Sequence, residues 1–172
     1  MKKIIICILI LFTLWGCDNN ARKLDEEKYN TYLLYYQSIL DSDSKKEKSQ
    51  CFDFSLAVNQ IGENLYRYDI IIDNPRVAMY EIKALAVIDN LTIEVDKNQM
   101  MPSVGILDNK NYNMIPFQVD TEKDFVSGIV LSLTSEQSAL RISVMIECKD
   151  SSGLNYVREY LSIYGEYVPN QE

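Results

Sequence analysis

Histidine is absent from the 172 residues of this chain. It is the commonest general base in enzymes, the commonest metal ligand and the side chain that titrates closest to neutral pH. Its absence excludes Ser-His-Asp and Cys-His catalysis and most zinc sites. We therefore expect a protein that is not an enzyme and that holds no metal and no cofactor.

Positive charge is also scarce. The chain has 17 Lys and Arg side chains against 25 Asp and Glu, a net charge of −8 at pH 7. Nucleic acids and anionic lipid surfaces both require a basic face on the protein that binds them. The composition therefore excludes nucleic acid as a partner and indicates a domain that stands off from a membrane surface.

Cysteine is rare, with four in the chain. Cys7 lies in the apolar N-terminal run and Cys17 directly follows it, which leaves Cys51 and Cys148 in the body of the chain. The alternation of neighbouring residues points Cys148 inward, whereas Cys51 is out of phase with the inward-facing residues of its own predicted strand. We therefore expect two separate, partly buried thiols, with a disulfide between them as the alternative.

The N-terminus carries the pattern of an export signal. Lys2 and Lys3 precede a run over residues 4–15 that is apolar except for Thr13, the order that is typical of a secretory signal. As a helix this run would be about 18 Å long, against about 30 Å for the hydrocarbon core of a membrane. It is therefore too short to span a membrane comfortably.

The end of this run, Leu14-Trp15-Gly16-Cys17, resembles the lipobox of bacterial lipoprotein signal peptides. Leu14, Gly16 and Cys17 match the pattern, and Trp15 stands where a small residue is usual. The resemblance implies cleavage between Gly16 and Cys17, removal of residues 1–16 as a signal peptide, and two acyl chains on Cys17. Two chains suffice for stable attachment, so it implies a protein anchored on the extracytoplasmic face of the cell membrane. An ordinary signal with an incidental cysteine is the alternative.

The next three segments differ in composition. Residues 17–23 are polar and would form the lipidated N-terminus and a spacer. Residues 24–41 carry apolar side chains at steps of three and four, which predicts one amphipathic helix. Its tyrosines favour packing on the protein's own domain, with an exposed recognition face as the alternative. Residues 42–50 contain no apolar side chain and predict a polar linker.

Between residues 51 and 168 the period of the apolar residues changes from 3.6 to 2, which predicts a single domain of β-strands followed by a short tail over residues 169–172. Turn signals separate the strands at regular intervals, and this spacing is typical of an antiparallel sandwich. The predicted strand segments cover residues 52–59, 66–73, 80–88, 91–95, 104–107, 115–119, 125–133, 140–148 and 155–164.

Several stretches of this domain resemble a known group. The strand over residues 66–74, the turn after it and the strand over residues 82–87 look like the immunoglobulin-like domains of extracytoplasmic lipoproteins. The whole chain is similar to small lipoproteins of Gram-positive bacteria. The resemblance implies a mainly β fold, an antiparallel immunoglobulin-like sandwich of seven to nine strands preceded by one amphipathic helix, and it implies no activity. The stretches that carry it are Tyr66–Asp69, Asp73–Pro75, Val77–Tyr80, Met100–Ser103 and Asn113–Phe117.

One group of side chains in the last predicted strand suits recognition. Tyr156, Arg158, Tyr160 and Tyr164 alternate with apolar residues and so share its outer face. Flat amphipathic rings bind glycans or extended peptides with little loss of entropy, so these four residues are a candidate binding face. The interpretation we favour is that the helix or a neighbouring strand covers them.

These features predict a lipid-anchored, extracytoplasmic binding or adaptor module without catalytic activity. Its expected partners are the membrane, through the N-terminal lipid, and an extracytoplasmic protein or glycan. One alternative is a carboxylate-dependent hydrolase of envelope polysaccharide, because two acidic side chains are sufficient for that chemistry. A structural or assembly lipoprotein, whose helix mediates self-association, is the other.

Overall fold

A computed structural model describes residues 23–89, 100–108 and 110–169 of the chain. The predicted signal peptide, the cleavage site at Gly16 and Cys17, and the strand predicted over residues 91–95 lie outside the described residues. Within the described part, no helix is both long enough and apolar enough to cross a membrane.

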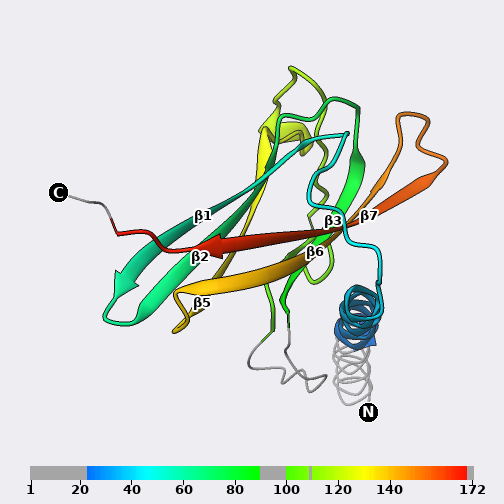
Figure 1. The fold of residues 1–172 in the computed structure, drawn as a ribbon. Coiled ribbons are helices and arrows are strands. Elements are labelled where there is room, and N and C mark those ends of the chain that lie inside the picture. The colour runs from blue at the N-terminus through cyan, green and yellow to red at the C-terminus, as the bar shows by residue number, and fades with distance from the viewer. Residues whose placement is uncertain (1–22, 90–99, 109, 170–172) are drawn as a thin grey trace, which may run out of the picture.

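The described chain is mainly β, with one α-helix over residues 23–40. Its seven strands form two antiparallel sheets, one with the order β1-β2-β5 and one with the order β4-β3-β6-β7 (Figure 1). This confirms the expected fold class at the level of two antiparallel sheets and one helix. The strands are β1 Asp53–Gly62, β2 Leu65–Asp73, β3 Tyr80–Ile88, β4 Ser103–Val104, β5 Gly128–Ser135, β6 Ala139–Lys149 and β7 Tyr156–Glu166, and a short 3₁₀ helix, η1, covers Thr121–Lys123.

The inward-facing residues of both sheets form a common core. In β2, Tyr68, Ile70 and Ile72 alternate with more exposed residues, as the period of two requires, and all three are fully buried. They share one hydrophobic cluster with the inward rows of the other sheet, so the two sheets pack face to face. The residues that the four-stranded sheet contributes are Ile82, Ala84, Ala86, Leu140, Ile142, Val144, Ile146, Cys148 and Leu161.

The helix covers the outer face of the four-stranded sheet. Tyr32, Tyr35, Tyr36 and Ile39 lie on one side of the helix at steps of three and four, and all are buried. They form a second cluster with outward-facing residues of β3 and β6, namely Leu85, Val87 and Met145. The expectation that the tyrosine stripe packs on its own domain is confirmed. The middle of strands β3 and β6 is therefore buried on both faces of the sheet, whereas a strand with one solvent-exposed face would be buried only at alternate residues.

The segment predicted as a polar linker is fixed to the sheet at one point. The backbone N–H of Lys46 donates to the carbonyl of Tyr160 at 2.9 Å, and the N–H of Ser162 donates to the carbonyl of Lys46 at 2.8 Å. These bonds add a single parallel bridge alongside β7. Since the helix also packs on the same sheet, helix and linker belong to the domain and do not form a separate stalk.

Two expectations about local structure are wrong. No strand forms over residues 115–119, because the N–H of Gln118 donates to the carbonyl of Ile115 and closes a turn around Pro116. Cys51 was expected to lie within a strand, out of phase with its inward-facing residues. Strand β1 begins at Asp53, so Cys51 precedes the regular alternation. Cys51 packs against the common core, to which Cys148 also belongs, and both side chains are free thiols.

Candidate functional site

The four residues predicted as a binding face on β7 do not form one continuous surface. Tyr156 and Tyr164 are 57% and 54% exposed, whereas Tyr160 packs between them against the helix cluster. At about 3.3 Å per residue, the two exposed tyrosines are roughly 26 Å apart along the strand. Each is paired with a cation of β6, Tyr156 with Lys149 and Tyr164 with Arg141. The middle of the predicted face is therefore covered.

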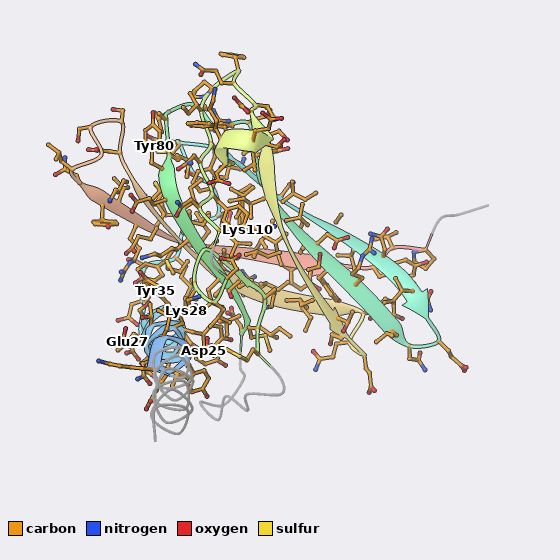
Figure 2. All side chains as sticks on the ribbon, turned by 180° about the vertical axis from the view of Figure 1, so that it is seen from behind. Asp25, Glu27, Lys28, Tyr35, Tyr80 and Lys110 are labelled. Carbon is orange, nitrogen blue, oxygen red and sulfur yellow. The ribbon has the colours of Figure 1, made fainter. Side chains whose placement is uncertain are left out.

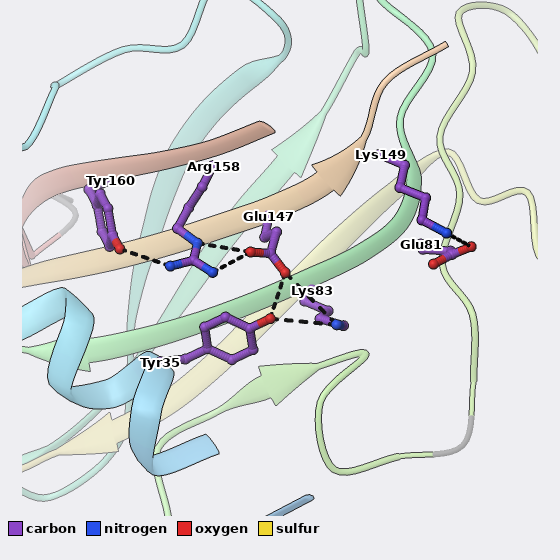
Figure 3. A network of polar contacts seen from close by, with 7 residues as sticks. All are labelled: Tyr35, Glu81, Lys83, Glu147, Lys149, Arg158 and Tyr160. Carbon is purple, nitrogen blue, oxygen red and sulfur yellow. Dashed lines mark hydrogen bonds and ion pairs between the residues drawn. The ribbon is translucent and has the colours of Figure 1, made fainter. Parts of the chain in front are cut away.

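Arg158, the fourth residue of that face, belongs to a polar network beneath the helix (Figure 3). The register places Lys83, Glu147 and Arg158 opposite one another on β3, β6 and β7. Arg158 donates through Nε at 2.9 Å and through Nη2 to Oε2 of Glu147, and Lys83 Nζ lies 3.8 Å from its Oε1. From the helix, the hydroxyl of Tyr35 donates to Oε1 of Glu147 at 2.5 Å.

The electrostatics of this network fix its protonation states. Burial alone would raise the pKa of Glu147, but the hydrogen bonds from Tyr35 and Arg158 and the charges of Arg158 and Lys83 hold it below its usual range. Burial and the bond to Glu147 raise the pKa of Tyr35. For Arg158, hydrogen bonds to Tyr160 and Glu147 outweigh burial and raise the pKa. At neutral pH the carboxylate is ionised and the phenol is neutral, so neither group is tuned for proton transfer.

This network joins the helix to the sheet. Both oxygens of Glu147 accept bonds, and the carboxylate side chain is only 9% exposed. A buried charge that is fully paired contributes mainly to holding its neighbours in one arrangement. We therefore assign the network a structural role, as the helix–sheet latch formed by Tyr35, Lys83, Glu147 and Arg158.

A second feature lies at the other end of the domain. A groove of about 590 Å³ is lined by Asp53 and by residues 74–76, 115–119 and 126–127. We call it the loop-end groove. The loops that form it lie at the end of the molecule opposite the helix (Figure 1). Figure 2 shows the same separation from behind, with Asp25, Glu27 and Lys28 on the helix at one end and Tyr80 toward the other. The volume of the loop-end groove is in the range of ordinary ligand sites.

The side chain that dominates the loop-end groove is Phe117. It is 107% exposed, so its ring has no packing partner on the domain. Its φ is +62°, a region that is a true outlier for a bulky residue. Pro116 precedes it and the Ile115–Gln118 hydrogen bond closes the turn, so Phe117 occupies the position where a turn of type II needs glycine. An aromatic ring is thus held in water at a conformational cost of about 1–3 kcal/mol.

The base of this turn is firmly held. Met79 and Met114 exchange two backbone hydrogen bonds, of 2.8 and 2.9 Å, and both side chains are buried in the common core. The side-chain oxygen of Asn113 accepts a bond from the N–H of Glu81 at 3.0 Å. The loop therefore presents Phe117 from a fixed backbone.

One ion pair supplies the charge in the loop-end groove. Arg76 Nη2 donates to Oδ1 of Asp53, and Asn74 Nδ2 donates to its Oδ2 at 3.0 Å. The bonds from Asn74 and Arg76 lower the pKa of Asp53, so it stays ionised. The remainder of the groove is mostly apolar, with Pro75, Ile115, Pro116, Val119 and Val126 among the lining residues.

Sequence reasoning missed the loop-end groove as a site. Two of the stretches that carry the resemblance to small lipoproteins, residues 73–75 and 113–117, supply lining residues to it, and Met79 of a third stretch pairs with Met114 at the base of its turn. The signal that could have found it is the Pro116-Phe117 pair, since a proline at the second position of a turn is commonly followed by glycine or asparagine. The positive φ of Phe117 and the contact between the loops are visible only in three dimensions.

Comparisons with known proteins found no match, neither among protein-family models nor among curated proteins nor among solved structures.

Proposed function

We propose that this protein is a lipid-anchored, extracytoplasmic binding module, without catalytic activity, whose loop-end groove takes an extended segment of a partner protein. The observation that carries the proposal is Phe117, an aromatic side chain fully exposed on a strained turn. Strained and solvent-exposed apolar residues lower stability, and they persist where the strain serves a site.

The chemistry of the loop-end groove favours a protein segment. Its branched aliphatic and proline side chains suit the apolar side chains of an extended peptide, and Phe117 offers a rigid aromatic contact with only two rotatable bonds. Arg76 and Asp53 are half exposed at its edge and suit a polar or charged group of the same peptide. A glycan would need more hydrogen-bonding side chains than this lining supplies.

Hydrolysis receives less support. Among the described residues that line the loop-end groove, Asp53 is the one acid, and Arg76 and Asn74 already bind it. Self-assembly through the helix receives little support either, since the tyrosine side of the helix packs on its own sheet.

The proposed anchor fits the position of the groove. Cys17 would carry the lipid, and residues 18–22 would join it to the helix. Six residue steps from Cys17 to residue 23 span at most about 20 Å, so the helix end of the domain would lie near the membrane. The loop-end groove would then face away from it (Figure 1). We further propose that the two sheets form an immunoglobulin-like sandwich, in which loops at one end carry recognition.

The test compares the unchanged protein with two variants. Phe117→Ser removes the exposed ring of the groove, and Leu154→Ser removes another highly exposed apolar side chain, in the β6–β7 turn, as the matched control. Peptides selected from a random displayed library against the unchanged protein should lose at least about tenfold in affinity on Phe117→Ser and keep their affinity on Leu154→Ser. Their nuclear magnetic resonance shifts should map to residues 74–76 and 115–119.

Two results would count against the proposal. If selected peptides bound both variants equally well, the groove would not be the recognition site. If no peptide were selected while an envelope glycan bound in a manner that depended on Phe117, the partner class would be a glycan.

A further inference from the structure

A smaller cavity, of about 200 Å³, lies where the start of β1, the loop before β3 and the ends of β6 and β7 meet. Cys51 and Cys148 both line it, although 96 residues separate them in the sequence. Phe52, Met79 and Val157 make its walls apolar. The two cysteines therefore line one partly open cavity and are not dispersed in separate parts of the core.

One of the residues that line this cavity, Glu159, carries an unsatisfied polar atom. Oε2 of Glu159 is the one buried side-chain oxygen or nitrogen in the described residues that has no hydrogen-bond partner. Buried polar atoms without partners are rare, and each calls for an explanation such as a redox or ligand role. Lys46 binds only the other oxygen of Glu159, at 3.5 Å. This wall of the cavity is thus not optimised for stability.

We propose that Cys51 and Cys148 are a redox pair, which a disulfide oxidant converts into a disulfide bond across this cavity. The bond would join Cys51, two residues before β1 of the three-stranded sheet, to β6 of the four-stranded sheet. It would tie the two sheets together at one end, next to the hairpin between β6 and β7.

The chemistry proceeds by two thiol–disulfide exchanges. The Cys51 thiolate attacks one sulfur of the oxidant, whose S–S bond breaks, and the released thiolate takes up a proton. Cys148 then loses its proton and attacks the Cys51 sulfur, which breaks the mixed disulfide and releases a second thiol. Two electrons and two protons pass from the protein to the oxidant, which becomes two thiols.

The two thiols differ in accessibility, which sets the order of these steps. Cys51 is partly exposed, whereas Cys148 is only 8% exposed. Burial, together with the charges of Cys51 and Glu159, raises the pKa of Cys148 to about 11, so its thiolate is scarce at neutral pH. The oxidant therefore reacts first with Cys51, and Cys148 resolves the mixed disulfide from inside the cavity.

The experiment uses the full chain with Cys7→Ser and Cys17→Ser, so that the other two thiols do not exchange. Equilibration with oxidised glutathione should leave no thiol that iodoacetamide alkylates after unfolding, and a non-reduced peptide map should contain Cys51 joined to Cys148. The Tm should rise by about 5–15 °C on oxidation, because the bond closes a loop of nearly 100 residues.

Single replacements test the order of the steps. With Cys148→Ser, the reaction should stop at a glutathione adduct on Cys51. With Cys51→Ser, glutathione should add to Cys148 at least about tenfold more slowly.

Several outcomes would overturn the proposal. One is that both thiols can still be alkylated after treatment with excess oxidised glutathione, and another is that each cysteine carries a glutathione adduct without a bridge between them. A disulfide between two chains, or a Tm that falls after the bridge has formed, would also contradict it. The first measurement needs no variant beyond the starting chain, so poor folding of a single-cysteine variant leaves the test intact. Binding of peptides at the loop-end groove is measured separately and does not depend on this result.

Discussion

The helix–sheet latch allows a quantitative prediction for Tyr35→Phe. The replacement removes one hydroxyl and keeps the ring, which stays buried against β6 and the guanidinium of Arg158, 5.1 Å from the ring centre. The main interaction lost is the bond to Oε1 of Glu147, together with a long bond of 3.5 Å that the hydroxyl accepts from Lys83 Nζ. Lys83 Nζ, at 3.8 Å, still faces that oxygen afterwards. A hydrogen bond to a charged group contributes about 1.5–3 kcal/mol, so the free energy of unfolding should fall by about 2 kcal/mol.

The measurement is urea unfolding followed by far-ultraviolet circular dichroism, together with amide hydrogen exchange over residues 23–40. Exchange in the helix should accelerate more than exchange in β6, because the latch fastens the helix to the sheet. Tyr164→Phe is the matched control, since its hydroxyl contacts Glu166 at 3.4 Å on the surface. That replacement should change the free energy of unfolding by less than about 0.5 kcal/mol.

A double-mutant cycle isolates the bond. Glu147→Gln removes the charge that Arg158 and Lys83 pair with, so it should lower the free energy of unfolding by about 3 kcal/mol. The amide oxygen that Glu147→Gln introduces is a weaker acceptor than the carboxylate, so the hydroxyl of Tyr35 contributes less in that background. The double variant should therefore be more stable than the sum of the single effects predicts, by about 1 kcal/mol. Additive effects would refute the coupling between Tyr35 and Glu147.

The dependence of the free energy of unfolding on pH has a definite sign for each of these two groups. The pKa of Glu147 is lower in the folded protein than its usual value, so its contribution is present above about pH 4.3 and is lost as the pH falls through the folded pKa. The pKa of Tyr35 is raised, so the phenol's contribution is present below about pH 10 and is lost as the pH rises further. The cost of Tyr35→Phe should be constant between about pH 5 and 9 and shrink in acid. A cost that grows in acid would contradict this reasoning.

Three further predictions concern other parts of the molecule. Phe117→Gly should raise the free energy of unfolding by about 1 kcal/mol, because glycine adopts a positive φ without strain; a loss of stability in urea unfolding would show that the turn is not strained. Gly105→Ala should lower the Tm far more than Gly153→Ala, although both residues have a positive φ. A Cβ at Gly105 would lie 2.2 Å from the carbonyl oxygen of Ile82, whereas no atom lies within 4 Å of a Cβ at Gly153. Equal losses of Tm would contradict this steric reason. Cys17→Ser should move the protein from the membrane fraction to the soluble fraction of cells, and unchanged fractionation on immunoblots would exclude lipidation at this residue.

The strands were predictable because their signal is local. Alternation over residues 140–148 predicted a strand with Ile142, Val144 and Ile146 facing inward, and these residues are buried in the common core. The spacing of Tyr32, Tyr36 and Ile39 likewise predicted the buried side of the helix. In both cases the period of the apolar residues follows directly from the geometry of the element.

The site was not predictable in the same way. The four residues of β7 were grouped by their common face, but the helix packs against Tyr160 in its middle, and Arg158, which stays partly exposed, binds Glu147 beside Tyr35 of the helix. Covering depends on where the helix docks, which the alternation along β7 does not encode. The turn at Phe117 was missed because a positive φ is a property of the closed loop and not of the residue type.

The amino-acid sequence by itself determined the acidic character of the protein and predicted the helix and the strands that form, in their order, and it predicts an export signal with Cys17 at its end. These features depend on residue type and spacing along a short segment. Only the tertiary structure decided that Lys83, Glu147 and Arg158 form one row and that Cys51 and Cys148 share a cavity. Register and loop closure bring together residues that are distant in the chain, and the energy of those contacts exists only once the sheets have packed.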